Sequence, residues 1–170
     1  TFDACVRSAQ LPEVTDLAAS VPELRIVLDN LGKPAIGTAA APLAPDATWI
    51  RDLRALAAHE QVSIKLSGLP AEAGGSWSAA QVTPFLDAAA EAFGPDRLLW
   101  GSDWPVSAIG SFEAEEAGSM RGADPVYRAD ARKIWARVVV DWAVARGYDV
   151  DAIFWRNAAR TYGVDAAGVA

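Results

Sequence analysis

Short apolar runs alternate along the chain with segments in which apolar residues recur at helical spacing. Runs rich in aliphatic and β-branched residues predict strands over residues 2–6, 24–28, 62–68 and 97–103. Helical spacing predicts helices over residues 11–18, 46–57, 78–93, 127–146 and 151–162. Strands that alternate with helices indicate an α/β fold with a parallel sheet and right-handed crossovers. No linker or repeat divides the chain, so we expect a single domain.

Two architectures fit this order of elements. One is a doubly wound four-stranded sheet, and the other is half of a (β/α)₈ barrel, which in complete form takes ~250 residues. Alternation along the strand at residues 62–68 puts Ser63, Lys65 and Ser67 on one face, opposite Ile64 and Leu66. Polar residues on an inward face suit a barrel lumen near its mouth better than a sheet covered on both faces.

Two polar residues follow predicted strands and are candidates for chemistry. Asp103 ends the strand at residues 97–103, and Asn30 comes shortly after the strand at residues 24–28. In parallel α/β folds, ligands bind at the carboxyl ends of strands, so Asp103 is a candidate general base or metal ligand. The alternative is a helix N-cap, which position alone slightly favours for Asp103.

Composition disfavours some classes of binding partner and indicates a cellular compartment. The chain has 170 residues, a net charge of -7 and one cysteine, Cys5. An acidic balance disfavours nucleic acid and anionic membranes as partners, and a lone cysteine allows no internal disulfide, so a cytoplasmic protein is the default. No apolar run approaches the ~20 residues of a membrane span. The chain starts at Thr1 without an initiator Met, so we expect a fragment or a processed product.

Several motifs, in this order and spacing, resemble the amidohydrolase-related metal-dependent hydrolases, on the branch of sugar lactonases and pyrone-dicarboxylate lactonases. They are Leu-Asp-Asn-Leu-Gly-Lys-Pro at residues 28–34, Lys-Leu-Ser-Gly-Leu at 65–69, Phe-Gly-Pro-Asp-Arg at 93–97, Gly-Ser-Asp-Trp-Pro at 101–105 and Asn-Ala-Ala-Arg-Thr-Tyr-Gly at 157–163. The resemblance covers nearly the whole chain except the acidic loop at residues 107–124.

The resemblance implies that residues 1–170 form a single partial domain, the C-terminal half of a TIM-type (β/α)₈ barrel with about four parallel strands and flanking helices. It implies that the N-terminal half, which carries the family's His-x-His after its first strand, is absent. A half-barrel leaves strand edges unpaired, so we expect self-association through them.

The implied activity is hydrolysis of a lactone of the sugar-acid or pyrone-dicarboxylate type, a small-molecule substrate. The resemblance gives Asp103 the role of activating water, and Asn30, at a position where the family usually has histidine, that of polarising the carbonyl. Lys65, Ser67 and Trp104 are the expected substrate-binding residues. Asp103 is expected to bind metal only if the complete enzyme is metal-dependent. This chain alone is expected to bind no cofactor, although a complete barrel of the family can hold a divalent metal such as zinc.

Alternatives remain open at this point. The chain could be a decarboxylase of the same superfamily or a non-catalytic truncated half-barrel that is inactive by itself; Trp104 in the Ser-Asp-Trp-Pro motif favours the lactonase branch. Lys65 either holds an anionic substrate or pairs with a carboxylate inside the barrel. Trp104 either walls a pocket or packs in the core, and the acidic loop is either a lid or an insertion. Core positions are expected for three tryptophans, Trp135, Trp142 and Trp155.

Overall fold

The computed structural model describes residues 1–74, 76–108, 111–112 and 130–165. Its central sheet has four parallel strands in the spatial order β1-β2-β5-β7. They are β1 Phe2–Ala4, β2 Ile26–Leu28, β5 Val62–Leu66 and β7 Leu98–Trp100. The parallel α/β sheet predicted from the sequence is therefore confirmed, with strands shorter than predicted. Because the strands are parallel and in register, their carboxyl ends share one edge of the sheet.

The predicted helices are present, with small differences at their ends. They are α1 Leu11–Ser20, α2 Ala47–Ala57, α4 Ala79–Phe93, α5 Ala131–Arg146 and α6 Asn157–Tyr162. A π-helical turn over Ala152–Arg156 leads into α6. Two predicted N-caps are confirmed: Asp46 accepts hydrogen bonds from the backbone N–H groups of Thr48 and Trp49, and Ser78 accepts one from Gln81.

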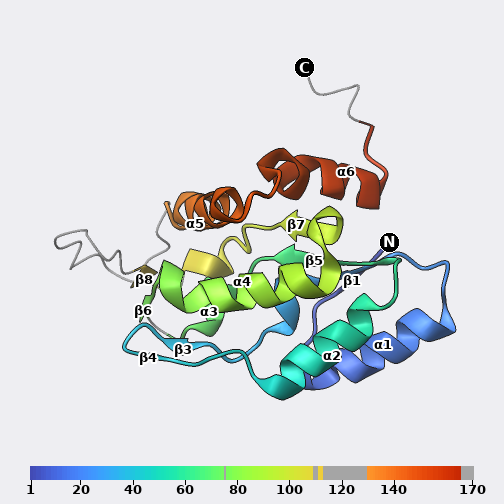
Figure 1. The fold of residues 1–170 in the computed structure, drawn as a ribbon, viewed down its shortest axis with the longest axis horizontal. Helices are drawn as coiled ribbons and strands as arrows, with labels where there is room; N and C mark the ends of the chain where they lie inside the picture. The colour runs from blue at the N-terminus through green and yellow to red at the C-terminus, as the bar shows by residue number, and fades with distance from the viewer. Residues whose placement is uncertain (75, 109–110, 113–129, 166–170) are drawn as a thin grey trace.

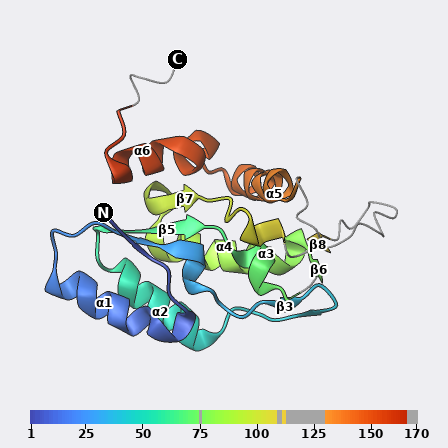
Figure 2. The ribbon, with the colours of Figure 1, turned by 180° about the vertical axis from the view of Figure 1, so that it is seen from behind.

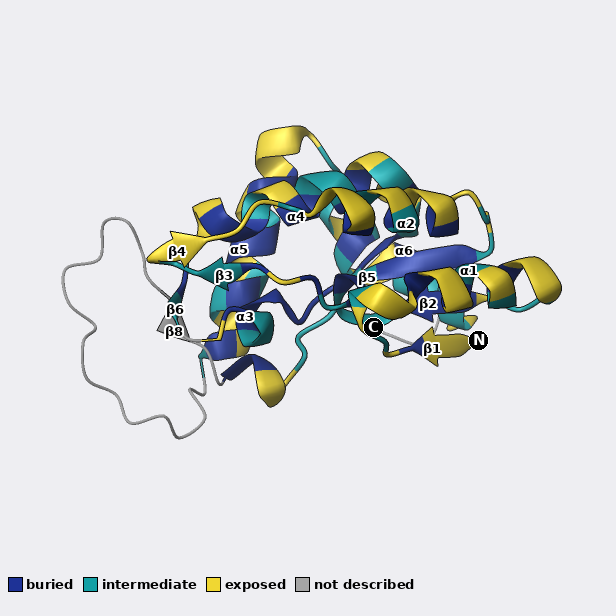
Figure 3. Ribbon diagram, turned by 90° about the horizontal axis from the view of Figure 1, so that it is seen from below, coloured by how far each residue is buried: buried dark blue, intermediate teal, exposed yellow. Residues whose placement is uncertain are grey.

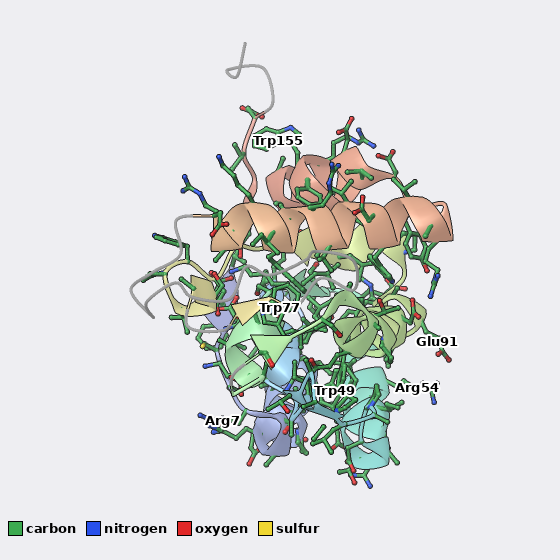
Figure 4. The ribbon with its side chains drawn as sticks, turned by 90° about the vertical axis from the view of Figure 1, so that its left-hand side faces the viewer. Arg7, Trp49, Arg54, Trp77, Glu91 and Trp155 are labelled. Carbon is green, nitrogen blue, oxygen red and sulfur yellow. The ribbon has the colours of Figure 1, made fainter. Side chains whose placement is uncertain are left out.

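The hydrophobic core lies between the sheet and the helices on one of its faces. Ile64 and Leu66 of β5 are fully buried in this core, whereas Ser63 and Lys65 point to the other face, as their alternation predicted. Figure 4 shows α5, α4 and α2 following one another around the sheet, and Figure 3 shows β5 buried among the helices. Figure 2 looks at the sheet from the side away from α4.

The C-terminal helix joins the two edge strands of the sheet. At its start, the Nδ2 atom of Asn157 donates hydrogen bonds to the backbone oxygens of Pro95 and of Leu98, the first residue of β7. At its end, the Tyr162 hydroxyl donates to Oδ1 of Asp3 in β1 at 2.6 Å. Figures 1 and 2 both place the end of α6 beside the N-terminus.

Arg97 supports the amino-terminal ends of the strands, opposite the edge where their carboxyl ends lie. Its guanidinium donates to the backbone oxygens of Phe93, His59 and Val62, at the amino-terminal ends of β5 and β7. Burial lowers the pKa of Arg97 below its usual value. These contacts join the end of α4 to the starts of β5 and β7, at the end of the sheet away from Asn30 and Asp103. Arg97 therefore has a structural role.

One tryptophan prediction is wrong. Trp135 and Trp142 are buried as expected, but Trp155 is 40% exposed. Figure 4 shows it on the outside of its turn, while Trp77 lies within the fold. The reason is that the turn before α6 directs Phe154 inward, where it stacks on Trp100 with ring centroids 5.0 Å apart.

Short elements connect the main strands and helices. Those that periodicity did not predict include helix α3 Leu69–Glu72 and strands β3 Gly37–Thr38, β4 Ala41–Pro42, β6 Ser76–Trp77 and β8 Ser111–Phe112. They are too short to show a period. Most of the acidic loop and the expected start of α5 lie outside the described residues. No helix in the described part of the chain is long and apolar enough to cross a membrane.

Candidate active site

Residues from the ends of three neighbouring strands meet at the carboxyl edge of the sheet. Asn30 follows β2, Ser67 follows β5 and Asp103 follows β7. The Ser67 hydroxyl donates to Oδ1 of Asn30 at 2.6 Å, and Nδ2 of Asn30 donates to Oδ1 of Asp103 at 3.4 Å. The sequence placed Asn30 and Asp103 at the same end of the sheet, and the structure brings them into contact.

The backbone at these strand ends adopts left-handed conformations. Asn30, Leu31, Lys33 and Asp103 have φ angles of 53°, 52°, 50° and 50°. Such angles are uncommon outside glycine, and the bulky Leu31 is an outlier even among them. The turn after β2 places Asn30 over Gly68 at the end of β5, and Asp103, which follows β7, faces the Asn30 amide. Strained backbone of this kind concentrates at functional sites, where the surrounding structure enforces it.

Two glycines make room for the Asn30–Ser67 pair. A β-carbon on Gly68, where φ is +76°, would lie 2.5 Å from the β-carbon of Asn30. A β-carbon on Gly101 would lie 3.1 Å from that of Ser67 and 3.3 Å from its hydroxyl oxygen. The close approach of the strand ends therefore depends on glycine at position 68, and a β-carbon at position 101 would push Ser67 aside by a few tenths of an ångström.

Trp135 of α5 bridges the ends of β5 and β7. Its indole Nε1 donates to the backbone oxygens of Leu66 at 3.2 Å and Gly101 at 3.1 Å. The side chain is fully buried and packs edge-on against Trp77. The helix α5 thereby fixes the spacing between the ends of β5 and β7.

Asp103 is half-buried, and this burial is the largest cause that raises its pKa above the usual value. The hydrogen bond from Asn30 and the positive charge of Lys33 act in the opposite direction, while the carboxylates of Asp29 and Glu72 add to the rise. A carboxylate with a raised pKa binds a proton more readily, which suits a group that must accept one from water.

Lys65 pairs with carboxylates, one of its two expected roles. Its Nζ atom lies 2.7 Å from Oδ1 of Asp29 and 3.5 Å from Oδ2 of Asp3, and 5.6 Å from the centre of the Tyr162 ring. Burial lowers the pKa of Lys65, but the hydrogen bonds to Asp29 and Tyr162 outweigh it, so the net pKa is raised. Burial and the hydrogen bond to Asp3 raise the pKa of Tyr162. The neighbouring Lys65 lowers this pKa, but the net pKa is still raised. Whether Lys65 also contacts a substrate stays a prediction.

Asp3, Asp29 and Tyr162 were not among the predicted site residues. Asp29 had a signal in the sequence, because it directly follows the predicted strand at residues 24–28 and precedes Asn30. Tyr162 appeared only as part of the motif at residues 157–163, and Asp3 had no signal, since their meeting with Lys65 depends on where α6 crosses to β1.

Trp104 lies next to Asp103 at the surface. It is 40% exposed, and the guanidinium carbon of Arg132 lies 5.9 Å from the centre of its ring. Of the two expectations for this residue, core packing is therefore wrong. The exposed ring leaves the pocket-wall role as a prediction.

The donors at this site do not by themselves fit a zinc ion. Asp103 offers one carboxylate, with the Asn30 amide and the Ser67 hydroxyl beside it. Structural and catalytic zinc sites take three or four nitrogen, sulfur or carboxylate ligands from the protein. In the described ranges, no group of three or more His, Cys, Asp or Glu side chains is placed to hold a metal ion.

Comparisons with known proteins agree with the fold and with the resemblance of the motifs. A family model described as amidohydrolase matches residues 1–164. The chain is 42% identical over 108 residues to an L-fucono-1,5-lactonase of Burkholderia ambifaria, covering 64% of this chain and 36% of that protein. It is 36% identical over 110 residues to a 4-sulfomuconolactone hydrolase of Rhizobium radiobacter, covering 62% and 34% of the two chains.

A solved structure extends the likeness to three dimensions. It is an amidohydrolase from Burkholderia multivorans with bound zinc, which superposes with a TM-score of 0.75 and 34% identity over 96% of this chain and 52% of that chain. The matched regions thus span between about a third and a half of the length of these relatives. Its four strands and their helices correspond to half of a (β/α)₈ barrel.

Proposed function

Because the chain belongs to the amidohydrolase family, we propose that the protein is a hydrolase that opens the ring of a lactone, with Asp103 as the general base. The single observation that supports this most is the contact between Asn30 Nδ2 and Asp103 Oδ1 at the carboxyl edge of the sheet. There, a carboxylate with a raised pKa lies beside an amide donor. The names of the relatives, two of them lactone-hydrolysing enzymes, support the choice of substrate class.

The reaction needs little more than a base and a hydrogen-bond donor. Asp103 takes a proton as a water molecule attacks the lactone carbonyl carbon, which forms a new carbon–oxygen bond and a tetrahedral oxyanion. When the ring carbon–oxygen bond breaks, the proton on Asp103 passes to the leaving ring oxygen. The product is the open hydroxy acid. A general base typically contributes about 10²–10⁴-fold to such a rate.

Asn30 serves this reaction as a donor. Its Nδ2 carries two hydrogens, of which one is directed at Asp103, and the other is available to a carbonyl oxygen or a developing oxyanion. An amide cannot relay a proton, so the proton transfer falls to Asp103 alone. Trp104 and Lys65 remain our proposed substrate contacts, the first through its exposed ring.

The remaining parts of the proposal concern the whole protein. We propose a small-molecule substrate of the sugar-acid or pyrone-dicarboxylate lactone type, no nucleic-acid or membrane partner, and a cytoplasmic location. A neighbour in the family contains zinc, but the donors described in this chain do not fit that ion, so no step of the proposed reaction is assigned to a metal.

A lactone panel tests the proposal. Proton release is followed with a pH indicator for neutral sugar-acid lactones and for a pyrone dicarboxylate, using this chain and any longer product of the same gene. Hydrolysis of at least one lactone, lost in Asp103→Asn, is the expected result. Release of carbon dioxide from a carboxylated substrate would favour the decarboxylase, and no turnover by any form would favour a non-catalytic half-barrel.

A further inference from the structure

Ser67 is committed to a protein contact at the candidate site. The residue is only 2% exposed, and its hydroxyl oxygen lies 2.6 Å from Oδ1 of Asn30. The sequence had favoured Ser67 as a substrate-binding residue. A hydroxyl has a single hydrogen to donate, and the contact with Asn30 uses it.

The two partners of Asn30 define one orientation of its amide. Oδ1 accepts from Ser67, and Nδ2 donates to the carboxylate of Asp103. If the amide turned over, its oxygen would face the ionised Asp103 oxygens, and two acceptors would oppose each other. If it rotated away, both hydrogen bonds would be lost.

The surrounding backbone leaves this arrangement little freedom. A β-carbon on Gly68 would lie 2.5 Å from that of Asn30, and a β-carbon on Gly101 would lie 3.1 Å from that of Ser67. The ends of β2, β5 and β7 therefore converge around the hydrogen bond between Ser67 and Asn30. Packing of this precision is what holds a donor in place for a reaction.

From this geometry we propose that Ser67 is a positioning residue, which holds the Asn30 amide with its N–H group toward Asp103 and the reacting carbonyl. The kinetic part of this inference rests on the proposed hydrolysis, whereas the structural part does not. Ser67 acts through Asn30, so its effect on the rate must disappear when Asn30 is removed.

The structural part is tested by NMR on the uniformly ¹⁵N-labelled chain. The side-chain NH₂ signals of Asn30 are identified by their loss in Asn30→Ala. We expect Ser67→Ala to move these signals toward those of solvent-exposed asparagines and to speed their exchange with water about 3–10-fold, the range for loss of one hydrogen bond. Unchanged Asn30 signals in Ser67→Ala would overturn the proposal.

Two further variants control this measurement. Ser63→Ala makes the same chemical change within β5, the strand that Ser67 follows, and we expect it to leave the Asn30 signals unchanged. Ser67→Cys keeps the shape of the side chain but has a larger atom and a weaker donor, and its exchange rate should fall between those of wild type and Ser67→Ala. Ser67→Cys also serves if Ser67→Ala does not fold, because a wild-type exchange rate in the cysteine variant would equally contradict the role.

The kinetic part uses the lactone that the panel identifies. We expect Ser67→Ala to lower kcat about 3–10-fold with KM changed less than about twofold, and to have no further effect in an Asn30→Ala background. A raised KM with unchanged kcat, or full additivity with Asn30→Ala, would instead make Ser67 a substrate contact and overturn the proposal. If no lactone is hydrolysed, the proposed function fails while the NMR result still decides the role of Ser67.

Discussion

A β-carbon on Gly68 would lie 2.5 Å from the β-carbon of Asn30, closer than real side chains approach. The sequence motif at residues 65–69 thus requires glycine because a second strand end passes directly over it. This relationship joins β2 to β5 at the edge where Asp103 also lies, and it can be tested without knowing the substrate.

Gly68→Ala should destabilise the protein and displace Asn30. The left-handed φ of +76° costs any L residue about 1–2 kcal/mol, and the clash with Asn30 adds about 1–3 kcal/mol. Gly74→Ala is the matched control, since Gly74 has φ +63° and open space around it. In urea denaturation, Gly74→Ala should lose only the unfolding free energy due to the left-handed backbone. Equal losses of stability in Gly68→Ala and Gly74→Ala would contradict the close approach of Gly68 to Asn30.

Asp103→Asn should lower kcat/KM for lactone hydrolysis by at least about 10²-fold, because an amide cannot accept the proton of the attacking water. Asp96→Asn is the control, because Asp96 is exposed and lies just before β7, at the opposite end of the strand. The measurement is initial velocity on one lactone for both variants. Wild-type activity in Asp103→Asn would remove the general base from the mechanism.

Asp103→Asn should also stabilise the fold near neutral pH. Burial raises the pKa of Asp103, so its contribution to stability is fully present below the pKa of an unfolded aspartate and is lost as the pH rises through the raised value in the folded state. Asparagine has no such loss. In thermal melts between about pH 3 and 8, the melting temperature of the variant should rise relative to that of wild type as the pH rises. A variant that is more stable than wild type only at acid pH would contradict this prediction.

Lys65→Met should cost about 1–3 kcal/mol of unfolding free energy, because the half-buried carboxylate of Asp29 loses a charged partner at 2.7 Å. The pKa of Lys65 is raised, so its stabilising contribution is present below the pKa of an unfolded lysine and is lost only as the pH rises through the higher folded value. Wild type and variant should therefore converge only in strong alkali.

Lys133→Met, on the exposed surface of α5, is the control for Lys65→Met and should change stability by no more than about 0.5 kcal/mol. Full stability in Lys65→Met, together with a raised KM for an anionic lactone only, would show that Lys65 serves the substrate rather than the fold.

Self-association is expected through β1. Within the described strands β1 pairs only with β2, and Phe2 is 47% exposed, whereas at the edge of β7 the Leu98 carbonyl already accepts a hydrogen bond from Asn157. Light scattering should show oligomers that Phe2→Glu reduces, because a charge at a strand edge opposes pairing. Val144→Glu, at an exposed position of α5, should not reduce them. A monodisperse wild-type monomer would contradict edge pairing.

The sequence by itself determined the order of the elements, the parallel sheet and the edge at which Asn30 and Asp103 meet. These features are local or follow from the rule that parallel strands share a carboxyl edge, so periodicity and the caps Asp46 and Ser78 were sufficient. The resemblance of the motifs identified the family for the same reason, since each motif is contiguous.

Only the tertiary structure decided which groups those residues contact. Lys65 pairs with Asp29 and Asp3, and Tyr162 reaches Asp3, because α6 crosses from the edge of β7 to β1, a path that no local pattern encodes. The exposure of Trp155 has the same origin, since the π-helical turn changes which side chains face the sheet. Contacts between residues far apart in the chain depend on how whole elements pack, and spacing along a single element carries no record of that packing.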